Sequence, residues 1–301
     1  PCPLAVLLAG GLVTTGASLR VHQEIDQQVQ AEFEHLVHRI AQETERRFKL
    51  PVYGLMGARG AYAASPQFSG AQFRAYVQSR DLSDEFPGIR GFGFIQRVLR
   101  DDLPRFQAAV RAEGAQAFSV NAPGTAADLY VIRYIEPLAA NLPAWGYDLG
   151  SDPKRRSAVE TAILAGRPTL SERVTLLQDA QQGPGFLFLL PVYRGGVVPE
   201  NEEDRLRLLH GVLYTPIVAR EIFEGVAEAA NGRLDFEVFD GPDTSRANLV
   251  YDLDQTPHKP SPNTPVQAYG RHFETRVSLT IGDRVFGLRA SSLPTFDSAY
   301  S

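Results

Sequence analysis

The sequence has almost no cysteine: Cys2 is the only one in 301 residues. One cysteine excludes an internal disulfide framework and a zinc cluster built from paired cysteines. The chain also has no strong excess of charge of either sign, because 30 basic and 35 acidic residues give a formal net charge of −5. A weakly acidic chain has no overall attraction to nucleic acid, and we expect no nucleic-acid partner.

Motifs of the common catalytic classes are missing as well. The sequence contains no G-x-S-x-G nucleophile motif and no H-E-x-x-H zinc motif, and no Gly-Lys-Thr follows the glycine pair of "RGFGF" to make a phosphate loop. His35 and His38 share a helix face, which we interpret as a solvated face rather than a metal site. We therefore predict that the chain is not an enzyme and that it binds no metal or cofactor.

Charge is absent from the first 19 residues, "PCPLAVLLAGGLVTTGASL", and the first charged residue is Arg20. About 20 apolar residues span a bilayer. We therefore interpret residues 1–19 as the outer part of a transmembrane helix whose start is missing. A signal-peptide core or a buried segment is the alternative.

Residues 20–49 contain neither glycine nor proline, and their apolar residues recur every three or four positions. This spacing predicts one apolar stripe on an otherwise charged helix, a rod of about 45 Å. We interpret residues 20–75 as a stalk whose stripe is buried on the following domain or on a second copy of the chain. Pro51 and Gly54 are predicted to kink or interrupt the helix. The stripe consists of Val21, Ile25, Val29, Phe33, Leu36 and Ile40.

The rest of the chain alternates β-like runs with helical patterns. "AFSVNAPG" and "LYVIRYIEP" are typical of strands. A helix is predicted from Pro153 to about residue 165, with Asp152 as its N-terminal cap and Gly166 at its end. "TLSERVTLL" and "FLFLLPVY" predict a β-hairpin whose second strand is apolar on both faces and should lie inside a sheet. Antiparallel hairpins with flanking helices indicate an α+β fold. We expect a first subdomain at 76–208 and a second at 209–301.

Asp148 has an unusual sequence environment for a carboxylate. It follows Trp145 and Tyr147 and precedes Leu149. A carboxylate among apolar groups must be hydrogen-bonded, or its pKa must shift. Two kinds of partner fit: the backbone amides of its own turn, which aspartate readily binds, or a ligand. The sequence chemistry leaves both open.

Several stretches together resemble a known family. They are "FPGIRGFGFIQRV" (86–98), "YIEP" followed by "NLPAWGYDLGSDPKRRSAVETAILAGRPTLSERVTL" (ending at 176), and "GPGFLFLLPVYRGG" (183–196). The chain resembles the CHASE domain family, the extracellular sensor modules of membrane-bound histidine kinases and nucleotide cyclases, over about residues 70–225. The resemblance implies a long stalk helix followed by two PAS-like subdomains, the first one distal and the second one proximal to the membrane.

The resemblance also implies a ligand pocket in the distal subdomain. In the plant cytokinin receptors of this family, an aspartate hydrogen-bonds the adenine ring of the ligand, and a backbone group on the strand after the helix completes that contact. Asp148 matches the aspartate, and Leu170 matches the strand position. Nearby aromatic residues are expected either to wall the pocket or to pack in the core. They are Trp145, Phe92, Phe94, Phe186, Phe188 and Tyr193.

The basic stretch "SDPKRR" (151–156) limits what the resemblance implies about the ligand. It favours an anionic ligand, or it is only a charged helix start. We therefore carry over the pocket but not the cytokinin. The expected ligand is a small molecule, such as an adenine-type compound or another planar heterocycle.

These features predict a small-molecule sensing domain in the periplasm, held in a bacterial inner membrane by flanking transmembrane helices. Two stalks are expected to form a homodimer, and the signal is expected to reach a cytoplasmic histidine kinase or diguanylate cyclase outside this chain. One alternative is a protein-interaction module, which predicts no sizeable pocket near Asp148. The other is a secreted hydrolase, which predicts a second titratable group within hydrogen-bond reach of Asp148.

Overall fold

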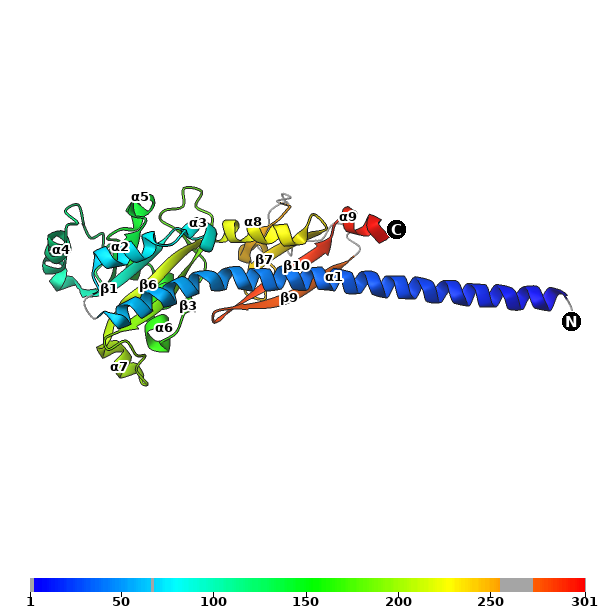
Figure 1. Ribbon diagram of the computed structural model, residues 1–301, viewed down its shortest axis with the longest axis horizontal. Helices are drawn as coiled ribbons and strands as arrows, with labels where there is room; N and C mark the ends of the chain where they lie inside the picture. The colour runs from blue at the N-terminus through cyan, green and yellow to red at the C-terminus, as the bar shows by residue number, and fades with distance from the viewer. Residues whose placement is uncertain (1–2, 66–67, 255–272, 301) are drawn as a thin grey trace.

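The structure is a computed structural model that describes residues 3–65, 68–254 and 273–300. Helix α1 (Pro3–Ala64) runs along the molecule, and its N-terminal part projects beyond the rest (Figure 1). Two β-sheets lie one after the other along α1, a distal sheet at the far end and a proximal sheet nearer the projecting part. The prediction of an α+β fold with a long N-terminal helix is confirmed.

The apolar stripe of α1 is buried against the chain's own sheets. Ile25 is 44% exposed and lies where the helix leaves the two subdomains. The side chain of Val21, the first residue of the predicted stripe, lies outside the described residues. The sequence allowed the stripe to be buried either on the following domain or on a second copy of the chain. In this structure it is buried on the following domain. The buried residues on α1 include Val29, Phe33, Leu36, Ile40, Phe48, Leu55, Ala58 and Tyr62.

The predicted interruption of the stalk at Pro51 and Gly54 is wrong. Helix α1 continues through both residues to Ala64. A proline inside a helix removes one backbone hydrogen bond and costs about 3 kcal/mol. Most helical stability in proteins comes from packing of the apolar face, and that face is buried on both sides of Pro51, at Phe48 and at Leu55.

The distal sheet is antiparallel, with the strand order β2-β1-β6-β5-β3 and with β4 paired to β5. Its last strand in the chain, β6, begins at residue 209, where the sequence placed the start of the second subdomain. Because β6 pairs with both β1 and β5, the distal subdomain extends through β6. The strands are β1 (Phe92–Leu99), β2 (Asp128–Glu136), β3 (Thr169–Leu170), β4 (Val174–Thr175), β5 (Pro184–Tyr193) and β6 (Leu209–Val218).

Short helices surround the distal sheet. The sequence predicted α6, its Asp152 cap and its left-handed Gly166 end correctly. It missed α4, and the stretch 117–124 is not a strand, because only an isolated bridge joins Asn121 to Tyr147 there. The helices are α2 (Gly70–Gln78), α3 (Leu82–Glu85), η1 (Arg100–Asp102), α4 (Leu103–Ala112), α5 (Leu138–Asn141), η2 (Leu142–Ala144), η3 (Leu149–Ser151), α6 (Pro153–Ala165) and α7 (Glu202–Arg207).

The proximal subdomain has its own antiparallel sheet in the order β8-β7-β10-β9. Its amphipathic helix α8 packs against α1. The proline-rich stretch "DQTPHKPSPNTPVQ" (254–267), whose composition is typical of a loop, falls almost wholly outside the described residues. The elements are α8 (Ala219–Ala230), β7 (Leu234–Asp240), η4 (Arg246–Asn248), β8 (Leu249–Asp252), β9 (Glu274–Ile281), β10 (Arg284–Ser292), α9 (Pro294–Asp297) and η5 (Ser298–Tyr300).

The distal sheet separates two apolar cores. Successive residues of a strand point to opposite faces. In β5, Phe186 and Phe188 therefore pack in the core that contains α1, whereas Leu187 and Leu189 pack in the core that contains α6. We call these the α1 core and the α6 core.

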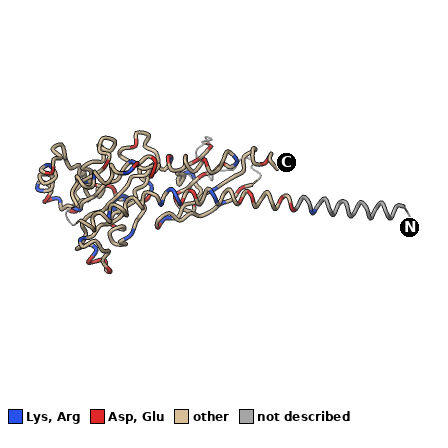
Figure 2. Tube along the Cα trace, viewed as in Figure 1, with Lys and Arg blue, Asp and Glu red and all other residues tan. Residues whose placement is uncertain are grey.

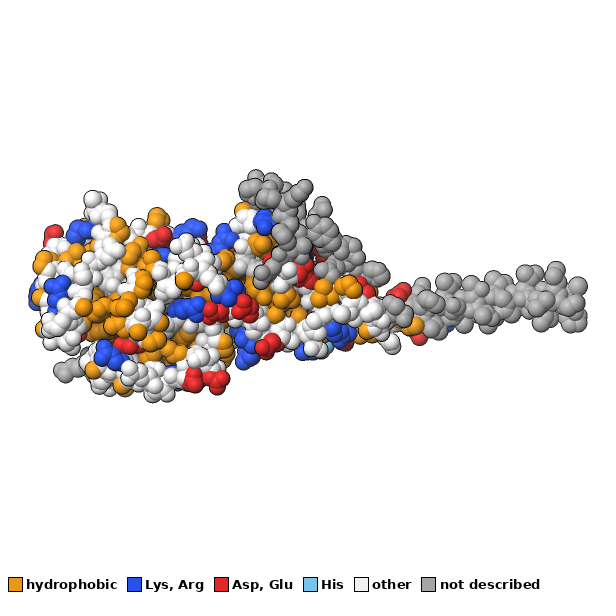
Figure 3. All heavy atoms as spheres, turned by 90° about the horizontal axis from the view of Figure 1, so that it is seen from above, with side chains coloured by type: hydrophobic (Ala, Val, Ile, Leu, Met, Phe, Trp, Pro, Cys, Tyr) orange, Lys and Arg blue, Asp and Glu red, His pale blue; other side chains and the backbone are white. Residues whose placement is uncertain are grey.

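Charged and apolar residues are distributed without a strong local excess in the views of Figures 2 and 3. Basic and acidic residues are interspersed along the described trace (Figure 2). On the face seen in Figure 3, apolar side chains are spread over the distal half among charged ones. Within the part of the chain that the structure describes, no helix combines the length and the apolar character needed to cross a bilayer.

The packing of α1 on the distal sheet predicts opposite effects for two glycines of the same helix. A Cβ atom on Gly54 would lie 2.4 Å from Cζ of the buried Phe92, whereas nothing lies within 4 Å of a Cβ on Gly60. Alanine favours a helix over glycine by about 1 kcal/mol, but overpacking costs about 1–3 kcal/mol. Gly60→Ala should therefore raise the thermal midpoint and Gly54→Ala should lower it, as measured by circular dichroism. Equal shifts for both variants would contradict this packing.

Candidate functional site

Asp148 is held by backbone amides on the α6 side of the distal sheet. It caps η3, and its side chain is completely buried. Its Oδ1 accepts hydrogen bonds from the backbone N–H of Tyr130 at 2.7 Å and of Gly150 at 2.9 Å. Its Oδ2 is buried and has no hydrogen-bond partner among the described residues. One oxygen therefore has a structural role, while the other lacks a donor.

Arg155 is a buried arginine without a counter-ion. Asp152 caps α6 by accepting from the Arg155 backbone N–H at 3.0 Å, and this turn directs the Arg155 side chain inward, where it is only 7% exposed. Its Nη2 donates to the carbonyl of Thr175 at 2.6 Å, and its guanidinium lies 5.6 Å from the ring centre of Tyr147. It forms no ion pair within the described chain. The other buried arginine, Arg289, pairs with Glu237 at 2.8 Å.

A small cavity of about 10 Å³ lies beside Arg155, enough for roughly one water molecule. The Tyr214 hydroxyl at this cavity is buried without a hydrogen-bond partner in the described structure, and burial raises its pKa, so it stays a protonated donor. Gln178 closes one side by donating to Asn141 Oδ1 at 3.1 Å. The lining residues are Ile132, Ala144, Leu149, Arg155, Leu176, Leu177, Gln178, Leu187 and Tyr214.

The aromatic walls expected around Asp148 do not surround it. Phe92, Phe94, Phe186 and Phe188 pack in the α1 core, on the opposite face of the sheet from α6 and η3. Tyr193 donates its hydroxyl hydrogen to the carbonyl of Ile163 at 2.6 Å. In this structure these four phenylalanine rings therefore pack in a core and do not form a wall around Asp148.

Leu170 contacts the proximal subdomain. Its backbone N–H points to Asp283 Oδ1 at 3.4 Å, in the turn between β9 and β10, and its side chain packs in the α1 core. Nearby, Arg173 donates to the carbonyls of Ala247 and Leu249 at 2.7 and 2.9 Å. The strand that the resemblance assigned to the ligand thus joins the two subdomains.

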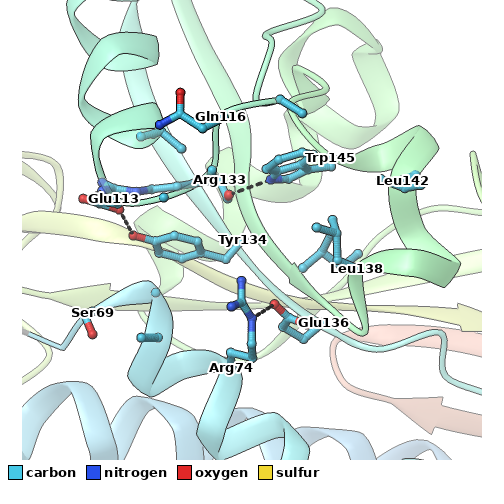
Figure 4. A pocket seen from close by; sticks show the side chains of 17 residues that line it. Ser69, Arg74, Glu113, Gln116, Arg133, Tyr134, Glu136, Leu138, Leu142 and Trp145 are labelled. Carbon is cyan, nitrogen blue, oxygen red and sulfur yellow. Dashed lines mark hydrogen bonds and ion pairs between the residues drawn. The ribbon is translucent and has the colours of Figure 1, made fainter.

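Among the predicted site residues, Trp145 lines a large cavity. This cavity has a volume of about 720 Å³ and lies between α2, the end of α4, β2 and η2 (Figure 4). The indole Nε1 donates to the carbonyl of Arg133 at 3.1 Å. Both arginines of the cavity are neutralised, since Arg74 pairs with Glu136 at 2.8 Å and Arg133 pairs with Glu113.

A cluster of three aspartates in the proximal subdomain has ligand-like spacing. Carboxylate oxygens of Asp235, Asp252 and Asp254 lie within 4.8 Å of one another. Oxygen donors of this kind suit Ca²⁺ or Mg²⁺. Acidic clusters are also common without an ion, and the cluster lies outside both cavities.

Sequence reasoning missed several polar residues at the cavities. Arg155 belongs to the basic stretch "SDPKRR", where its burial could not be told from that of Lys154 or Arg156. The position of Arg133 could have been noticed in the sequence, because a charged residue is unusual within the apolar run "LYVIRYIEP". Nothing in the sequence distinguished Tyr214 or Gln178, because tyrosine is common in apolar strands and glutamine is common in loops.

The sequence comparison identifies one family. The family model of the CHASE domain matches residues 66–251. No curated protein matches the chain.

Two solved structures are similar in fold. One is an extracellular ligand-binding receptor from Desulfohalobium retbaense, with a TM-score of 0.55 and 13% identity, over 87% of this chain and 40% of that one. The other is the periplasmic sensory domain of the Campylobacter jejuni chemoreceptor Tlp1, with a TM-score of 0.54 and 10% identity, over 90% of this chain and 97% of that one. The chain thus spans less than half of the first protein but nearly all of the second domain.

The two buried arginines should respond oppositely to replacement by methionine. Arg155→Met removes an unpaired buried charge and should stabilise the ligand-free chain by about 1 kcal/mol or more. Arg289→Met leaves Glu237 without its partner and should destabilise the chain by about 3–5 kcal/mol. Urea unfolding followed by circular dichroism measures both. A loss of stability in Arg155→Met similar to that in Arg289→Met would show that Arg155 has an adequate partner.

Proposed function

The chain belongs to the CHASE domain family of extracellular sensing domains, and we propose that its small ligand binds in the α6 core beside Arg155. The observation that carries this proposal is the buried arginine without a counter-ion. Family members are sensors rather than enzymes. Consistent with this, the side chain of Asp148 bonds only to backbone amides in the described structure, so the hydrolase alternative lacks its second titratable group.

The polar groups of the α6 core are costly in the absence of a ligand. A buried donor or acceptor without a partner costs about 1–3 kcal/mol, and a charged one costs more. Arg155 lacks a counter-ion, and Asp148 Oδ2 and the Tyr214 hydroxyl lack hydrogen-bond partners within the described residues. A ligand that satisfied these groups would recover this energy on binding. Such a cost is common at functional sites, where local stability is exchanged for binding.

The same groups define the chemistry of the ligand. Arg155 matches a carboxylate or phosphate, because its guanidinium binds such groups through paired hydrogen bonds. The apolar residues Ile132, Leu149 and Leu187 border the cavity beside Arg155. Asp148 Oδ2 is proposed to accept an N–H or O–H of the ligand. We therefore propose a small acidic molecule that also carries a hydrogen-bond donor, on a planar heterocycle or on an amine.

Entry of this ligand requires movement of the loop at 176–183. The cavity beside Arg155 holds only about one water molecule, and Leu176, Leu177 and Gln178 form part of its wall. The hydrogen bond from Gln178 to Asn141 ties this loop to α5. Opening of the loop would break this partly buried hydrogen bond and move the buried Leu176 outward, which would enlarge the cavity.

The signal would travel from the α6 core through the sheet to α1. On β5, Leu187 borders the proposed site and its neighbours Phe186 and Phe188 pack in the α1 core. Phe186 contacts Phe48 of α1, with ring centres 6.3 Å apart. A shift of β5 would thus displace α1. We propose that two such helices pair in a homodimer anchored in a bacterial inner membrane and transmit the displacement to a cytoplasmic histidine kinase or diguanylate cyclase.

One observation favours the alternative of a protein-interaction module. The cavity beside Arg155 is far below the roughly 300 Å³ of ordinary ligand sites. In that alternative the α6 core is filled permanently, and its unsatisfied groups only reduce stability. Ligand screening separates the two functions.

The proposal predicts binding that depends on Arg155. The 301-residue chain is screened by calorimetry against succinate, glutamate, adenosine monophosphate and uncharged adenine. Arg155→Gln should weaken each acidic compound that binds by about tenfold or more, because a charge-assisted pair is lost. Lys154→Gln removes the same charge from the same helix turn at an exposed position and should bind like wild type.

Two outcomes would reject this site. Acidic compounds that bind Arg155→Gln as well as wild type would place the ligand elsewhere. No binding by any compound, together with a stabilised Arg155→Met variant, would favour the interaction module. Asp148→Asn keeps the Oδ1 acceptor and should reduce affinity only for compounds that donate to Oδ2.

A further inference from the structure

A further polar cavity lies at the end of helix α1, on the face of the distal sheet opposite to Arg155. Its volume is about 380 Å³. It is formed by α1, β1, β2, the end of α4 and β6, and it shares no lining residue with the cavity beside Arg155. The polar and aromatic residues that shape it include Tyr62, Phe94, Arg133, Tyr134, Arg194 and His210.

A β-bulge places Arg133 in this cavity. Phe94 pairs with Tyr134 and Ile95 pairs with Ile132, so Arg133 is the extra residue of β2. A bulge of this kind redirects a side chain. Arg133 Nη1 donates to Gln96 Oε1 at 2.6 Å and Nη2 donates to Glu113. Its Nε is buried without a hydrogen-bond partner among the described residues.

Tyr62 brings a second unsatisfied donor to the cavity. It lies in the last turn of α1, stacks on Phe94 with ring centres 5.1 Å apart, and is 7% exposed. Its hydroxyl is buried and has no partner within the described chain. Burial raises the pKa of this hydroxyl well above its usual value, so it keeps its proton and can only gain from an acceptor.

The charges around the cavity favour an anion. Arg194 forms no ion pair with any described residue, and His210 packs 5.4 Å from the ring centre of Tyr62 and 5.5 Å from that of Phe94. The one carboxylate, Glu113, is engaged by Arg133 and by the Tyr134 hydroxyl, which donates at 2.9 Å (Figure 4). Donors therefore outnumber free acceptors, and the net charge is positive.

We propose that this cavity binds an oxyanion, the carboxylate or phosphate group of a small metabolite, between Arg194, His210, Arg133 and Tyr62. The 720 Å³ cavity of Figure 4 lies next to it and shares Ser69, Glu113, Arg133 and Tyr134 with it. That larger cavity gives room for the rest of the molecule. The occupant contacts α1 directly at Tyr62, so it acts on the same helix as a ligand of the α6 core, from the other face of the sheet.

The pKa of His210 reports on the occupant. Contact with the two rings buries part of the imidazole and lowers its pKa, and the charges of Arg194 and Arg133 act in the same direction. Of the other titratable groups that line the cavity, Glu113 is already paired and Tyr62 and Tyr134 are neutral. A bound anion favours the protonated imidazole and raises its pKa. Anion affinity should therefore rise as the pH is lowered from about 7.5 to about 5.5.

The test is a titration of the full chain with sodium sulfate at constant ionic strength, followed by NMR of the histidine rings. Sulfate stays doubly charged over this pH range, and the signal of His210 is the one that disappears in His210→Gln. We expect a saturable shift of this signal and a raised His210 pKa. Parallel titrations with acetate and with phosphate distinguish a carboxylate from a phosphoryl group as the natural head group.

Variants separate the site from general effects of salt. Arg194→Gln should weaken sulfate binding by about tenfold or more, and Tyr62→Phe should weaken it without loss of thermal stability. Arg207→Gln removes an equal charge from exposed α7, outside the cavity, and should respond like wild type. A His210 response that does not saturate, or that is unchanged in Arg194→Gln, overturns the proposal. The same titration on Arg155→Gln should keep the saturable His210 response, so either site can fail alone.

Discussion

The structure depends on one set of contacts between three phenylalanine rings. Phe48 of α1, Phe186 of β5 and Phe286 of β10 lie with their ring centres 5.5–6.3 Å apart. Each ring belongs to a different unit: the stalk, the distal sheet and the proximal sheet. All three side chains are completely buried, and aromatic burial of this kind is worth several kcal/mol. A displacement in either sheet is therefore felt by α1, because the packed rings leave no free space to absorb it.

The distal sheet has contrasting polar chemistry on its two faces. On the α6 face, Arg155 is buried without a counter-ion in the described structure. Its desolvation costs free energy that an anionic ligand would offset on binding. On the α1 face, Arg194 and His210 are open to solvent, so an anion gains mainly charge attraction there. A sheet between two such faces can connect two chemical inputs to one helix.

Much of the site and fold followed from local patterns in the sequence. The capped start of α6, its glycine end and the hairpin of β3, β4 and β5 were predicted because each depends on residues close in the chain. The interruption of the helix at Pro51 was predicted wrongly, since the packing of distant strands against α1 outweighs the local cost of the proline. Whether the aromatic rings wall a pocket or pack in the core was left open for a similar reason. Period-two alternation shows that Phe186 and Phe188 share a face, but not which layer covers it.

The sequence by itself determined the family, the fold class, the apolar stripe of the stalk and the capped start of α6. These features depend on periodicity, capping residues and motifs within short stretches. The tertiary structure decided which of three neighbouring basic residues is buried without a partner, and that Leu170 joins the subdomains. It also decided that Tyr62, Arg133 and His210 meet around one cavity. Burial and charge pairing arise between residues far apart in the chain, so no local pattern records them.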